Sequence, residues 1–177
     1  YEGGDSAYRS KDDFPYMDAD GNTFDDRDFA GGDSFPALDA ATSFPYVPTV
    51  PAGLEDYKNP AWLNDPIYYH NRGNSTFVGE NSQYGDFFGL DDLFTEHPIV
   101  VDGMIDIFKT WVSDYGVDGF RIDTVKHVNT EFWQQFGPEL MAHAEAEGIN
   151  EFFMFGEVFD GNPAFLSEFT TDGELPS

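Results

Sequence analysis

Two acidic residues stand where their carboxyl groups could work together. Asp123 and Glu157 each lie at the carboxyl end of a short predicted strand, at 117–123 and 152–158. Functional groups of α/β sheets and barrels gather at this end of the strands, and neighbouring strands lie about 4.8 Å apart. In retaining glycosidases the nucleophile and the acid/base carboxyl lie about 5 to 5.5 Å apart. The two residues therefore have the type and the expected spacing for cleaving a glycosidic bond.

A second interpretation of the same residues is purely structural. Arg121 lies two positions before Asp123, so both side chains project from one face of the strand. They could form a buried ion pair that closes one layer of a barrel, and a glutamate that follows a glycine at a strand end, like Glu157, is common. The strand pattern alone leaves both interpretations open.

The elements that must position these residues are predicted by apolar periodicity. A helix is expected to begin at Pro98 and to end before Gly116, and a second helix is expected over about 130–147, restarted or kinked at Gly137 and Pro138. The apolar face of the first helix comprises Val101, Met104, Ile105, Phe108, Trp111, Val112 and Tyr115. Helix, strand, helix and strand in alternation predict an α/β fold with parallel neighbouring strands.

Residues 1–97 have a different character. They are rich in Gly, Pro, Asp and aromatic residues, with turn signals every few positions and no sustained periodicity. We expect an irregular, loop-rich lobe here, and its many aromatic side chains favour an ordered, functional segment over a disordered one.

Composition excludes several classes of partner. The chain has 34 acidic and 8 basic residues and a formal net charge of -26, so nucleic acids and anionic membrane surfaces would repel it. Neutral sugars and cations such as calcium are suitable partners. The chain has no cysteine, which excludes disulfides and thiolate metal sites, and no apolar run long enough to span a membrane.

Three separated motifs resemble those of the α-amylase family of glycoside hydrolases. GFRIDTVKH at 119–127 and FGEV at 155–158 resemble its two catalytic-strand motifs. LDDL at 90–93 resembles its calcium-side segment, which more often has Pro where Asp91 stands. The order and spacing of the motifs match as well, from about residue 65 to residue 165.

The resemblance implies a role for each matching residue. Asp123 would be the nucleophile that forms the glycosyl-enzyme, and Glu157 would protonate the leaving oxygen and then activate water. Arg121 would keep Asp123 ionised and oriented. Lys126 and His127 would contact the leaving-group sugar.

The resemblance also implies a calcium ion that ties the lobe to the barrel. Asp92 would bind it through its carboxylate and His127 through its main-chain carbonyl, with Glu80 as a further ligand. A second acidic run, DADGN at 18–22, resembles the start of a calcium loop but lacks the full spacing of one, so we expect an exposed turn there.

The family fold is a (β/α)8 barrel with an irregular lobe inserted after its third strand. Residues 1–97 would be mostly that lobe, and residues 98–177 would run from the third helix to the fifth strand and part of the following loop. The motifs that should come before and after these segments, including the third catalytic carboxylate, are not in the sequence. We therefore expect a barrel fragment that lacks the remainder of its own barrel and is inactive alone.

The function that follows is retaining hydrolysis of α-1,4 bonds in starch-like glucans, with α-glucan as the partner. Two alternatives stay open: an α-glucosidase or glucan transferase of the same family, and a non-catalytic homologue that binds sugar. We expect an extracellular location; the chain starts at Tyr1, and any signal peptide would precede it.

Overall fold

The computed structural model describes residues 6–169 and divides into two units. The first unit ends at Val100 and the second begins at Val101. Each is described by itself below. None of the helices within residues 6–169 combines the length and apolar character needed to cross a membrane.

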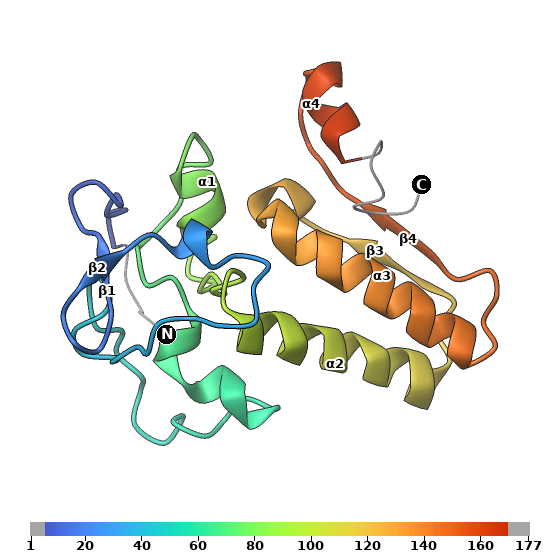
Figure 1. Cartoon of the computed structure of the whole chain (residues 1–177), viewed down its shortest axis with the longest axis horizontal. Coiled ribbons are helices and arrows are strands. Elements are labelled where there is room, and N and C mark those ends of the chain that lie inside the picture. The colour runs from blue at the N-terminus through green and yellow to red at the C-terminus, as the bar shows by residue number, and fades with distance from the viewer. Residues whose placement is uncertain (1–5, 170–177) are drawn as a thin grey trace. The chain divides into compact units, whose positions relative to one another are not determined.

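The second unit is built from helices and a parallel strand pair (Figure 1). Its elements are α2 (Pro98–Tyr115), which starts at the end of the first unit, β3 (Gly119–Ile122), α3 (Thr130–Ala146), β4 (Phe153–Gly156) and α4 (Pro163–Glu168). A short 3-10 helix, η4 (Val125–His127), follows β3. This order confirms the predicted alternation of helices and strands.

Helix boundaries follow the expected backbone signals. Helix α2 begins at Pro98, as predicted, and Gly116 follows its end with a φ of 61° that favours glycine. Helix α3 is continuous through Pro138, so the proline does not restart it. Gly148, with a φ of 82°, follows the end of α3.

Strands β3 and β4 pair in parallel, as the long crossover through α3 requires. The register places Arg121 opposite Phe155 and Ile122 opposite Gly156. Both strands are shorter than predicted, because regular pairing stops at Ile122 and Gly156. Gly119 has no room for a side chain, since a Cβ atom there would overlap the main-chain oxygen of Phe153.

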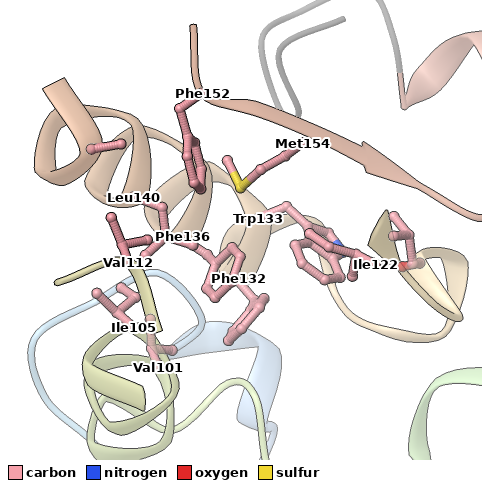
Figure 2. Packing of buried hydrophobic residues seen from close by; sticks show 12 residues of the cluster. Val101, Ile105, Val112, Ile122, Phe132, Trp133, Phe136, Leu140, Phe152 and Met154 are labelled. Carbon is pink, nitrogen blue, oxygen red and sulfur yellow. Dashed lines mark hydrogen bonds between the residues drawn. The ribbon is translucent and has the colours of Figure 1, made fainter. Parts of the chain in front are cut away.

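The core of the second unit lies on one face of this strand pair. Ile122 and Met154 point into it and meet the apolar faces of α2 and α3 (Figure 2). The other buried members are Val101, Ile105, Val112, Val125, Phe132, Trp133, Phe136, Leu140, Ala144 and Phe152. This packing fixes the strand ends on which Asp123 and Glu157 stand.

The opposite face of the strand pair is open in the described part of the second unit. Phe153 and Phe155 stack on each other there, with ring centroids 5.8 Å apart, and are 53% and 49% exposed. Arg121 shares this face and is also exposed. Within residues 101–169, the strand pair is therefore covered on one face only.

The first unit consists mainly of loops held by short elements. These are β1 (Tyr16–Met17) and β2 (Thr23–Phe24), which pair antiparallel, the 3-10 helices η1 (Asp26–Asp28), η2 (Ala61–Asn64) and η3 (Pro66–Tyr68), and α1 (Asn81–Tyr84). Aromatic rings form much of its interior: Tyr16 lies 5.0 Å from Phe94 and 5.9 Å from Phe44 between ring centroids. The loop-rich character expected for this part of the chain is present.

Candidate active site

Asp123 and Glu157 lie one residue beyond the last paired residues of β3 and β4. The Glu157 main-chain N–H donates to Ile122 O at 2.7 Å, and the Val125 N–H donates to Glu157 O at 3.1 Å. These two bonds continue the contact between the strands past the end of regular pairing. They hold the two carboxyl-bearing residues at the same edge.

The two carboxyl groups form one charged group with Arg121. Arg121 Nη2 lies 3.2 Å from Glu157 Oε2 and 3.8 Å from Asp123 Oδ1. One guanidinium therefore contacts both carboxyl groups.

The surroundings of Asp123 favour its ionised form. The interaction with the Glu157 side chain lowers the pKa of Asp123 most, and the Arg121 charge and the Thr124 main-chain N–H act in the same direction.

The structural interpretation of Arg121, a buried ion pair with Asp123 alone, is wrong for this structure. The Arg121, Asp123 and Glu157 side chains are 53%, 66% and 41% exposed. The nearer partner of Arg121 is Glu157. An accessible group of two carboxyls and one cation is suited to meeting a substrate.

Lys126 and His127 lie in η4, directly after the turn that follows Asp123. The turn itself is made by Thr124, whose φ of 57° is left-handed. The Lys126 ammonium donates to Phe159 O at 2.5 Å and lies 3.8 Å from Asp160 Oδ2. It thus contacts the loop that follows β4, which the sequence motif did not indicate.

The three residues expected at the calcium site are divided between the two units. Asp92 and Glu80 lie in the first unit, and His127 lies in the second. Glu80 Oε1 accepts hydrogen bonds from Tyr8 Oη at 2.6 Å and from the Lys11 main-chain N–H at 2.9 Å. This carboxylate is therefore already used in tying the N-terminal segment to the loop before α1.

Asp92 contacts a buried histidine. Asp92 Oδ2 lies 2.8 Å from His70 Nδ1, and Glu96 Oε2 lies 2.9 Å from His70 Nε2. Both ring nitrogens face carboxylate oxygens, which accept, so His70 is an imidazolium that donates on both sides. Burial opposes this charge, but Glu96 and Asp92 outweigh it and raise the pKa of His70 to about 9.

Asp26 extends this buried network. It pairs with the Lys11 ammonium, which lies 3.8 Å from the centre of the Tyr84 ring. Ligand atoms of Asp26, His70 and Glu96 lie within 4.8 Å of one another. The sequence analysis did not identify this network, because its members come from distant positions and share no motif.

The first unit has two candidates for binding calcium: Asp92, and the group of Asp26, His70 and Glu96. The group formed by Asp26, His70 and Glu96 contains an imidazole, whereas calcium prefers oxygen ligands, and its buried Asp26 is paired with the Lys11 ammonium. Asp92 also contacts His70, but its side chain is 25% exposed and its ligand atoms are all oxygens. Of the two, Asp92 fits a calcium ion better.

The acidic run at 18–22 forms a turn, as expected. Asp18 Oδ1 accepts from the main-chain N–H groups of Asp20 at 2.9 Å and Asn22 at 2.8 Å, and the Asn22 side chain donates to both oxygens. The carboxylate thus serves the local backbone.

Comparison with known proteins gives consistent matches. The model of the family described as alpha amylase, catalytic domain, matches residues 11–176. An alpha-amylase of Streptomyces lividans is 52% identical over the whole chain, and a cyclomaltodextrin glucanotransferase of Klebsiella oxytoca is 33% identical over 60% of it. The chain spans only 19% and 16% of the lengths of these two proteins.

Solved structures agree with the sequence matches. The crystal structure of an Anoxybacillus alpha-amylase superposes with a TM-score of 0.53 and 34% identity, covering 64% of this chain and 25% of its own. The crystal structure of an alpha-amylase from Geobacillus thermoleovorans complexed with acarbose superposes with a TM-score of 0.52 and 31% identity. This match covers 63% of this chain and 25% of that one.

Proposed function

Because this chain belongs to the α-amylase family of glycoside hydrolases, we propose that it carries the nucleophile and the acid/base residue of an enzyme that hydrolyses α-1,4 bonds in starch-like glucans with retention of configuration. The observation that best supports this proposal is the position of Arg121 between the two carboxyl groups, 3.2 Å from Glu157 and 3.8 Å from Asp123, at the ends of two parallel strands. The chain spans about a fifth of its Streptomyces relative, 19%, so the activity proposed is that of the whole protein.

In the first step, the ionised Asp123 attacks the anomeric carbon, and the bond from that carbon to the glycosidic oxygen breaks. Glu157 gives its proton to the departing oxygen, so the leaving sugar is released as an alcohol. The product is a glycosyl ester of Asp123.

In the second step, Glu157 accepts a proton from water, and the resulting oxygen nucleophile attacks the same carbon. The ester bond to Asp123 breaks, and both carboxyl groups return to their starting states. Two inversions at one carbon give net retention. Arg121, which lies 3.8 Å from that carboxylate, favours the negative charge of Asp123 before the attack and again when the ester bond breaks.

The fold of the second unit is that of a (β/α)8 barrel fragment, as its alpha-amylase neighbours indicate. We infer that residues 1–97 are a lobe inserted between the third strand and third helix of the complete barrel, and that residues 98–177 run from that helix to the fifth strand region. Lys126 and His127 would then face the leaving-group side of the scissile bond. Their position directly after the nucleophile strand supports this assignment.

Product analysis tests the function. The active protein that carries this chain is incubated with starch, maltotriose and sucrose, and the anomeric form of the first products is followed by NMR. We expect maltooligosaccharides in the α-form from starch. Exclusive action on sucrose, or β-anomers as first products, would refute the proposal.

A transferase is the second candidate, because cyclomaltodextrin glucanotransferases of several bacteria are among the relatives. In such an enzyme a sugar hydroxyl takes the place of water in the second step. Cyclic or lengthened glucans formed from starch would identify it. Linear, shortened products would support hydrolysis.

We further propose that the protein binds calcium, with the Asp92 carboxylate as a ligand and Glu80 as a weaker candidate. Asp91 precedes Asp92, and Asp86 Oδ1 accepts from the Asp92 main-chain N–H at 2.9 Å, so a bound cation would offset the negative charge of these neighbours. Chelation is expected to lower the melting temperature and to increase proteolysis of the first unit before the second. The proposed participation of the His127 carbonyl rests on the family resemblance. Identical melting and proteolysis with and without chelator would contradict the site, and Asp92→Asn should abolish any chelator effect.

A further inference from the structure

The loop that carries Glu157 has a side-chain link to the loop that carries Asp123. Beyond the main-chain bonds at Ile122 and Val125, the Lys126 ammonium reaches Phe159 O at 2.5 Å and Asp160 Oδ2 at 3.8 Å. No helix or strand lies between Gly156 and Pro163. Lys126 is therefore a side-chain support for a segment that has no regular structure of its own.

The Lys126 side chain is largely buried, and the helix that carries it is anchored to the core. Its side chain is only 19% exposed, although lysine rarely leaves water without a partner. The helix η4 that carries it is anchored to the core, because Trp133 Nε1 donates to Val125 O at 3.1 Å. Both residues of that anchor are buried. The Lys126 ammonium thus extends from a helix that the core holds in place.

Asp160 connects the link to the start of the next helix. Its Oδ1 accepts from the Asn162 main-chain N–H at 2.8 Å, while its Oδ2 faces Lys126. The Asn162 side chain in turn accepts from the Ala164 N–H at 3.1 Å and caps α4. The path from Glu157 to α4 is held at both Phe159 and Asp160.

We propose that Lys126 is a positioning residue for the reaction: by clamping the loop after β4 it sets the position of Glu157 relative to Asp123. This inference rests on the proposed function for its catalytic consequence. This role of Lys126 differs from a direct contact with the leaving-group sugar. The clamp affects the reaction of every substrate, whereas a sugar contact affects only substrates that carry that sugar. The Phe159 side chain takes no part, since its carbonyl makes the bond.

The test compares Lys126→Met with Lys126→Arg and Lys109→Met in the active protein that carries this chain. Lys109 forms a similar ion pair, 2.6 Å from Glu139 Oε2, between α2 and α3 and serves as the matched control. Kinetics are measured on starch and, by methanol release, on a methyl maltooligoside, whose leaving group is not a sugar but still needs a proton from Glu157. Hydrogen exchange of residues 157–162 is followed in the same samples.

For Lys126→Met we expect kcat to fall about 10- to 100-fold on both substrates, with a smaller change in KM, because small misplacements of catalytic groups have effects of this size. The pH dependence of kcat should shift, and exchange in residues 157–162 should rise. Lys126→Arg should restore part of the activity, since a guanidinium can make both contacts. Lys109→Met should change none of these quantities by more than about twofold.

Two results would overturn the clamp. One is a loss confined to starch with normal turnover of the methyl maltooligoside, which would indicate a sugar contact. The other is unchanged kcat and pH dependence, whether or not exchange rises. If the unmodified protein shows no glycosidase activity, the proposed function fails instead, and unchanged exchange in Lys126→Met would then refute the clamp separately.

Discussion

Replacing Asp123 with asparagine is expected to abolish turnover while leaving the fold intact. The amide has nearly the same shape as the carboxylate but carries no negative charge, so it cannot form the glycosyl ester. Loss of a catalytic nucleophile lowers kcat by about 10⁴- to 10⁶-fold in well-studied enzymes. Because Asp123 is 66% exposed and lies outside the core, the substitution should not unfold the second unit.

The measurement is kcat on starch in the active protein, with mass spectrometry to detect the glycosyl-enzyme. Asp118→Asn is the matched control, since Asp118 is an exposed aspartate just before the start of β3, at the end away from Asp123. It should retain full activity. Near-normal turnover of a folded Asp123→Asn protein would rule out the nucleophile role.

Replacing His70 with alanine is expected to cause the largest loss of stability. His70 is fully buried and lies between Glu96 and Asp92, and Glu96 is itself 1% exposed. Without the imidazolium, Glu96 would be left as a buried charge that has lost its partner. Removing one member of a buried ion pair costs about 3 to 5 kcal/mol.

Urea denaturation provides the measurement, with His143→Ala as the control. His143 is a partly exposed histidine outside the core, and its Nε2 lies 2.7 Å from Ser113 Oγ, so its loss should change the free energy of unfolding by less than about 1 kcal/mol. The double variant His70→Ala, Glu96→Leu should be less destabilised than the sum of its single variants, because the stranded charge is gone. Equal stability of His70→Ala and His143→Ala would contradict the network described here.

The sequence by itself determined the parts of this protein that depend on regular repeats. Apolar residues that recur every three and four positions predict the buried face of α2 correctly at Val101, Ile105 and Val112, whereas Trp111 and Tyr115 of the predicted face are exposed. A period of two separates Ile122 from Arg121 and Asp123. Parallel strands joined by a helix end at the same edge, so the proximity of Asp123 and Glu157 followed from their positions at strand ends. The motifs around them were sufficient to indicate the family.

Only the tertiary structure decided which side chains meet when no repeat relates them. Lys11, Asp26, His70 and Glu96 come together because the path of irregular loops brings them together, and no periodicity predicts that path. The partners of Lys126 could not be predicted either, because a long flexible side chain can reach many groups around it. Local repeats specify faces and strand ends, whereas contacts between distant loops are set by how the whole chain packs and by the need to pair each buried charge.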